Sequence, residues 1–115
     1  MTHLIERKVV WIIDVDQWPR AMLRAELIER GFDAVGYETV GDAIESLLLR
    51  PPNVIVVDLR GQPTRLVERL HDIGVPVLII AGTPEINELP ERTWAAVMRR
   101  PVSIGEIANA VEARA

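Results

Sequence analysis

Three short apolar runs, rich in β-branched residues, constrain this chain more than any other feature of its sequence. They cover residues 9–13, 54–57 and 75–80, and none of them alternates with polar residues. A strand with one face in water would alternate, so these runs predict strands covered on both faces, as in the centre of a parallel sheet. The weaker segments 33–38 and 95–98 are typical of edge strands. The sequence therefore predicts a five-stranded parallel sheet.

Segments with helical periodicity separate the strands. They predict helices from residue 19 to just before Gly31, and over 40–49, 64–73 and 104–114. In the second of these helices, Leu47 and Leu48 are expected to face inward. Residues 83–92, rich in proline and glutamate, leave room for one helical turn, so the fourth helix is reduced. Strands and helices that alternate over short connections predict a three-layer α/β sandwich.

Composition excludes several classes of function. The 115 residues predict a single domain, 1–115, and the absence of cysteine excludes a disulfide scaffold, a cysteine-based zinc site and a thiol nucleophile. A net charge of -4 argues against a broad nucleic-acid surface. The apolar runs are too short to span a membrane, and the charged N-terminus has no signal-peptide pattern. We therefore expect a cytoplasmic protein with no nucleic-acid or membrane partner.

Charged residues follow the apolar runs, where an open parallel sheet binds its ligands. Asp14 and Asp16 follow the first run, Asp58 follows residues 54–57, and Arg100 follows the last strand. If the strands that carry Asp14 and Asp58 are neighbours, the two carboxylates repel, which raises the pKa of one carboxyl unless a cation lies between them. Either Mg²⁺, which prefers oxygen ligands, or the guanidinium of Arg100 would relieve that repulsion.

The order and spacing of these features resemble the receiver domain of two-component response regulators, of the chemotaxis-regulator type. The resemblance covers nearly the whole chain and is carried by the segments 10–14, 31–35, 41–43, 53–59, 75–80 and 100–102, together with Arg20. It implies a flavodoxin-like fold with strands in the order 2-1-3-4-5.

The resemblance also implies roles for single residues. Asp58 takes the phospho-acceptor position, which receives a phosphoryl group from a sensor histidine kinase or another signalling protein in a phosphorelay. Asp14, Asp16 and Asp58 would hold Mg²⁺, and Thr83 would supply a hydroxyl. The implied protein is not an enzyme. It is a stand-alone phosphoprotein for signal transduction that acts through protein–protein contact, and it is a candidate homodimer.

Four positions that serve phosphorylation depart from the family pattern. They are Val15 in place of the second metal-binding acid, Ala81 in place of a hydroxyl residue, Arg100 in place of a lysine, and Val97 in place of an aromatic switch residue. Asp16 and Thr83 are the nearby substitutes for the lost carboxylate and hydroxyl. Lys8 is the only lysine and starts the first strand, so no other lysine replaces the missing one. Arginine is planar and bidentate, so the exchange at Arg100 is not conservative.

Three interpretations of function remain open at this point. In the first, Asp58 is phosphorylated and acts through an altered switch. In the second, the chain is a phosphorylation-independent pseudo-receiver, a protein-binding module in which Arg100 pairs with Asp58 and imitates an occupied site. In the third, it is a small α/β nucleotide- or cofactor-binding domain, although no glycine-rich loop follows the first strand and no Walker motif is present.

Two tryptophans carry smaller expectations. We expect Trp18 to pack over the first helix, with an exposed partner anchor as the alternative. Trp94 either covers the gap left by the reduced fourth helix or marks an interface. The same reduction is expected to expose an apolar patch that favours self-association.

Overall fold

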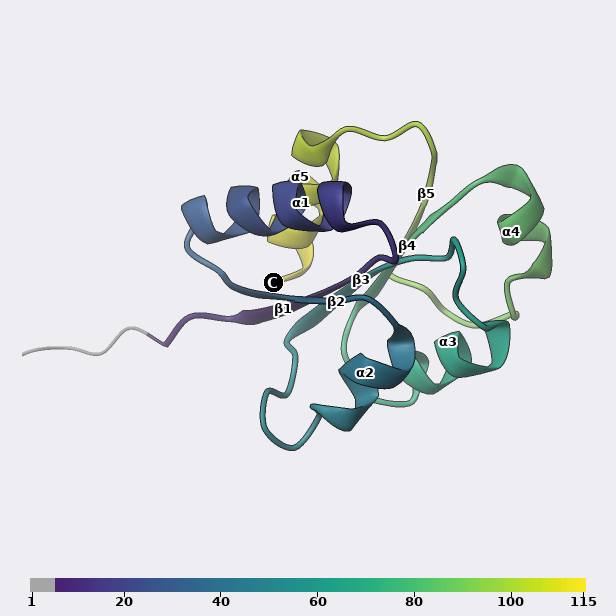
Figure 1. The fold of residues 1–115 in the computed structure, drawn as a ribbon, viewed down its shortest axis with the longest axis horizontal. Helices are drawn as coiled ribbons and strands as arrows, with labels where there is room; N and C mark the ends of the chain where they lie inside the picture. Colours follow the sequence, from purple (N-terminus) through teal and green to yellow (C-terminus); the bar gives the residue numbers. More distant parts are fainter. Residues whose placement is uncertain (1–5) are drawn as a thin grey trace, which may run out of the picture.

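The three apolar runs form the middle of a five-stranded parallel sheet (Figure 1). The structure is a computed structural model and describes residues 6–115. The strands follow the order β2-β1-β3-β4-β5, which confirms the predicted topology. Their bounds are β1 Val9–Ile13, β2 Asp33–Tyr37, β3 Val54–Asp58, β4 Val77–Ala81 and β5 Ala96–Arg99.

Helices cover both faces of the sheet, as the absence of polar alternation in its strands requires (Figure 1). α1 (Gln17–Glu29) and α5 (Ile104–Arg114) pack together on one face, whereas α2 (Val40–Glu45) and α3 (Thr64–His71) cover the other. α4 (Thr83–Glu88) follows β4. None of the helices in the described residues has the length and apolar character needed to cross a membrane.

Two apolar clusters separated by the sheet form the core. Leu23 and Leu27 of α1 pack with α5 on one side, and Val67 and Leu70 of α3 pack with α2 on the other. Trp11 is fully buried in the second cluster, and its indole Nε1 donates to the Arg50 carbonyl at 2.8 Å. Alternate residues of each central strand therefore serve the two clusters, which accounts for the continuous apolar runs.

The end of α2 corrects one expectation. The helix ends at Glu45 instead of continuing to residue 49, and Leu48 is exposed instead of inward-facing. The reason lies at Ser46, whose hydroxyl bonds the Ala43 carbonyl at 2.7 Å and the Tyr37 hydroxyl at 2.6 Å. These bonds hold Ser46 against β2, and the chain leaves the helix in a series of turns.

α4 is short, as expected, although its six residues exceed the single turn predicted. None of its residues is buried. Trp94 is half-buried beside it, packs against the α2–α3 cluster and lies edge-on to His71 with ring centroids 5.5 Å apart. Its indole Nε1 donates to the Pro90 carbonyl at 3.2 Å. Trp94 therefore covers the part of the core that a six-residue helix leaves open.

Candidate functional site

Asp14 and Asp58 lie together at the carboxyl edge of the sheet. Asp58 ends β3, Asp14 follows β1, and these two strands pair directly, with Ile13 opposite Val57. Both residues are almost completely buried, at 6% exposure for Asp14 and 4% for Asp58. They line a cavity of about 120 Å³ together with Arg60 and Arg100. The structure thus brings together three of the residues singled out by the sequence, namely Asp14, Asp58 and Arg100.

Both aspartates are held by the backbone two residues further along the chain. The Asp16 N–H donates to Asp14 Oδ1 at 2.9 Å, and the Arg60 N–H donates to Asp58 Oδ1 at 3.0 Å. The turn after Asp58 needs Gly61, whose φ of +72° lies in the region that side chains disfavour. A Cβ at Gly61 would lie 3.2 Å from Cγ1 of Val15, so an apolar side chain packs against this turn where the family has its second acid.

Arg60 supplies the cation between the two carboxylates. Its Nη2 lies 3.7 Å from Asp14 Oδ1 and 3.6 Å from Asp58 Oδ2. A cation between the two carboxylates was expected from the sequence, but Arg60 was not identified as its source. The spacing between Asp58 and Arg60 could have indicated it. A long cationic side chain two residues after an aspartate at a strand end can extend back over the ends of the strands.

Arg100 links Asp58 to α4. Its Nη1 donates to Asp58 Oδ1, and its Nη2 donates to both carboxylate oxygens of Glu85, with a distance of 2.7 Å to Oε2. The Arg100 N–H donates to the Ala81 carbonyl at 2.9 Å, which places the residue beside the end of β4. Glu85 also accepts a hydrogen bond from the N–H of Gly82. Glu85 was not among the residues singled out by the sequence, and it becomes a site residue because its side chain extends from α4 to Arg100.

The ionisation of these groups follows from burial and from their partners. Burial raises the pKa of Asp14, and the charge of Asp58 adds to this, although the Asp16 N–H and Arg60 oppose it. Burial acts to raise the pKa of Glu85, but the hydrogen bonds from Arg100 and Gly82 outweigh it and lower that pKa. Burial acts to lower the pKa of Arg100, but Glu85 and Asp58 outweigh it and raise that pKa. Arg100 therefore stays charged between two acids.

Asp16 and Thr83 lie apart from this arrangement. The Asp16 carboxylate accepts from the Trp18 N–H at 3.4 Å, and so it caps α1, which begins at Gln17 rather than at residue 19. Thr83 is exposed at the first position of α4, whereas the α4 residue that bonds Arg100 is Glu85.

The predicted magnesium set of Asp14, Asp16 and Asp58 is not assembled. In the part of the chain that the structure describes, no three acidic or histidine side chains are grouped so that they could hold a metal ion. Mg²⁺ can bind through one or two carboxylates when water completes its octahedral shell. Here the Arg60 guanidinium already lies beside both Asp14 and Asp58. Because this cation stands between the two carboxylates, the residues present do not fit a resident magnesium ion.

Trp18 corrects another expectation. Its side chain is 74% exposed, so it does not pack over the first helix. It is the second residue of α1, two positions after the cap at Asp16. The alternative, an exposed aromatic residue beside the acidic edge of the sheet, is the arrangement that the structure shows.

Comparisons with known proteins identify the fold. The sequence matches no family model and no curated protein. A response regulator receiver protein from Pseudomonas putida superposes with a TM-score of 0.81 at 22% identity, over 96% of this chain and 99% of that one. An orphan response regulator of H. pylori gives 0.79 at 20% identity, over 95% and 98%. The chain has the response regulator receiver fold.

A third receiver structure gives the same result. The receiver domain from Methylobacillus flagellatus has a TM-score of 0.74 at 18% identity and covers 96% of this chain and 100% of that one. In this receiver fold, the cavity that holds Asp14 and Asp58 lies at the carboxyl ends of β1 and β3, where open α/β sheets bind their ligands. The topology thus places the charged cluster at the edge of the sheet best suited to a functional site.

Proposed function

We propose that this chain is a receiver-fold signalling domain that binds a partner protein, and that its own arginines hold the Asp58 site without phosphorylation. The observation that carries the proposal is the bridge in which one guanidinium, that of Arg100, bonds both Asp58 and Glu85. A charge-assisted bridge of this kind is strong and directional. It links the end of β3 to α4 permanently, which a phosphoryl group on Asp58 would do only transiently.

The contacts around Asp58 support a site at which the carboxylate is not phosphorylated. Its Oδ1 accepts from the Arg60 N–H and from Arg100, and its Oδ2 faces the Arg60 side chain. Attack on a phosphoryl donor needs a free carboxylate oxygen and a cation placed to neutralise the transferring group. Here the cationic groups bind the carboxylate itself. The arrangement therefore favours the pseudo-receiver interpretation over the phosphorelay one.

The partner is a signalling protein, such as a sensor histidine kinase, because the solved neighbours named above are response regulators or their receiver domains. Trp18 offers an anchor for that contact, since exposed tryptophans are enriched among residues that dominate binding energy. Its place beside the charged edge of the sheet would let a partner sense the Arg100 bridge. The proposed activity is recognition, with no metabolic substrate, in the cytoplasm.

A second candidate function is phosphorylation of Asp58 itself. One observation favours it, because Asp58 shares a cavity with Asp14 at the end of β3, in the position that the family resemblance gives to the phospho-acceptor. In that case Arg60 and Arg100 would contact the phosphoryl group and would need to release the carboxylate first.

Intact-mass spectrometry distinguishes the two functions. The protein is incubated with Mg²⁺ and acetyl phosphate, beside an established receiver domain as a positive control and Asp58→Asn as a negative control. We expect the established receiver to gain a phosphoryl group while this chain gains none. An adduct on the wild-type chain that is absent from Asp58→Asn would overturn the proposal and establish the second function.

Arg100→Lys supplies a matched variant for the same experiment. Lysine restores the residue of the family pattern and removes the guanidinium that bonds both Asp58 and Glu85. If the bridge is what silences Asp58, this variant acquires labelling that the wild-type chain lacks. Equal labelling of the wild type and Arg100→Lys would contradict that role for Arg100.

A further inference from the structure

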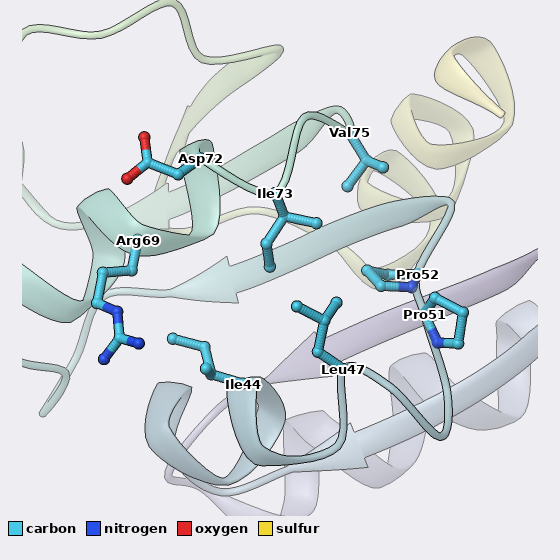
Figure 2. Close-up of a pocket in the computed structure, with 8 residues that line it drawn as sticks. All are labelled: Ile44, Leu47, Pro51, Pro52, Arg69, Asp72, Ile73 and Val75. Carbon is cyan, nitrogen blue, oxygen red and sulfur yellow. The ribbon is translucent and has the colours of Figure 1, made fainter.

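An apolar groove lies between α2 and α3, at the opposite edge of the sheet from Asp58. Figure 2 shows its aliphatic side chains facing one another across an open space. The groove has a volume of about 580 Å³ and is lined by Ile44, Leu47, Pro51, Pro52, Ile73 and Val75, with Arg69 and Asp72 at its rim. Pro52 and Val75 precede β3 and β4, so the groove lies at the amino ends of these strands. It is therefore separate from the Asp58 site.

Two exposed leucines stand beside this groove. Leu48 is 96% exposed and Leu49 is 84% exposed, and in the chain they lie between Leu47 and Pro51, which both line the groove. Single exposed leucines are ordinary on protein surfaces. Two in succession, in the segment between two groove-lining residues, add exposed apolar surface next to the groove, and such surface is typical of an interaction site. We call these two residues the leucine pair.

We propose that this face joins two copies of the chain in a symmetric dimer, in which the leucine pair of each copy enters the groove of the other. The argument rests on self-complementarity. The exposed leucine pair and the apolar groove are neighbours on one surface. A twofold axis beside them therefore brings the leucine pair of each copy against the groove of the other. Such an isologous contact uses the same surface on both copies, forms a dimer that adds no further copies, and buries both the leucine pair and the groove. A different partner would have to match the leucine pair and the groove separately.

The charges at the rim favour the same occupant. Arg69 and Asp72 are both exposed, and neither belongs to an ion pair among residues 6–115. One is cationic and the other anionic, so a twofold axis through the groove would pair Arg69 of each copy with Asp72 of the other. The rim of the groove is thus complementary to itself in charge as well as in shape.

Sedimentation equilibrium on the full chain tests the dimer. We expect the wild type to approach twice its 12.9 kDa chain mass with rising concentration, and Leu48→Asp/Leu49→Asp to dimerise roughly a hundredfold more weakly. Both leucines are exposed, so the variant should fold normally, which circular dichroism checks. Met22→Ser is the matched control, because it removes an exposed apolar side chain of α1 outside the groove and should leave the dimer intact.

Charge exchange supplies a second, independent variant. Arg69→Asp and Asp72→Arg should each weaken the dimer, because each places like charges across the axis, and the double exchange should restore it. A wild type that stays monomeric up to about 1 mM would overturn the proposal. So would a dimer that survives the aspartates at 48 and 49, since another surface would then form it. Neither result bears on the phosphorylation experiment, which concerns the other edge of the sheet.

Discussion

The guanidinium of Arg100 donates a hydrogen bond to the carboxylate of Asp58 across the carboxyl edge of the sheet. Arg100 follows β5 and Asp58 ends β3, so this single contact spans the end of β4 that lies between them. The second nitrogen of the same guanidinium bonds Glu85 and thereby ties α4 to the sheet. A buried carboxylate is costly unless it is paired, and here the pairing also determines where a short helix lies.

Replacing Arg100 with lysine should loosen α4. A lysine ammonium is a compact charge on a flexible stem and does not reproduce the planar geometry that serves Asp58 and Glu85 together. We expect Arg100→Lys to lower the free energy of unfolding by about 1–2 kcal/mol and to speed amide exchange in α4. Urea denaturation and hydrogen exchange measure the two effects. Arg99→Lys is the control, because Arg99 is exposed and absent from the network, and a similar loss there would contradict the prediction.

A methyl group at Gly82 should break the Glu85 contact specifically. A Cβ there would lie 2.7 Å from Glu85 Oε2, so the carboxylate must move away from Arg100. We expect Gly82→Ala to cost about 1 kcal/mol, and to cost much less in a Glu85→Ala background, which has no carboxylate for the new Cβ to displace. Gly105→Ala in α5 is the control, because its Cβ would meet Ser103 Oγ at an ordinary contact distance of 4.0 Å and should stabilise the helix. Equal costs of Gly82→Ala in both backgrounds would argue against the contact.

The pH dependence of stability should reveal Asp14. Its pKa is raised above the ordinary value of 3.8, chiefly by burial, so the folded state prefers the neutral acid. The unfolded chain therefore loses this proton first, and the stability that Asp14 contributes at low pH disappears as the pH rises from below 3.8 through the raised pKa. We expect Asp14→Asn, which keeps an acceptor for the Asp16 N–H, to become more stable than the wild type as the pH rises toward 7.

Thermal melts of both proteins between acidic and neutral pH measure this difference. Asp42→Asn is a suitable control, because Asp42 lies on the surface side of α2, away from the cavity. A constant difference between Asp14→Asn and the wild type across the range would show that the burial of Asp14 has no net effect on its ionisation.

Removing Arg60 should make the site sensitive to divalent cations. Arg60→Ser leaves Asp14 and Asp58 without the cation between them, so their repulsion should lower the melting temperature. We expect Mg²⁺ to raise the melting temperature of Arg60→Ser by ligand linkage, but not that of the wild type, when NaCl is used to match ionic strength. Arg65→Ser, on the exposed surface of α3, is the control and should behave as the wild type. Stabilisation of the wild type by Mg²⁺ would contradict the role given to Arg60.

Local patterns in the chain were sufficient for the layers of the architecture, but not for the order of its strands. Apolar runs without polar alternation predict that helices cover both faces of the sheet. The strand order was implied by the family resemblance. The position of Asp14 and Asp58 at one edge follows because each comes at the end of an apolar run, and parallel strands end at the same side. The continuation of α2 to residue 49 was wrong, because the helix ends at Glu45, where the Ser46 hydroxyl is hydrogen-bonded to the Ala43 carbonyl and to the hydroxyl of Tyr37 in β2.

The sequence by itself determined the layers, the order of the elements and the edge of the sheet where the acids gather, because periodicity and strand ends are local properties. Only the tertiary structure decided which cations neutralise those acids. Arg60 and Glu85 enter the site through long side chains whose direction depends on the turn at Gly61 and on the placement of α4. The contacts of Arg60 with Asp14 and of Glu85 with Arg100 join segments far apart in the chain, and no spacing along one strand or helix encodes those distances.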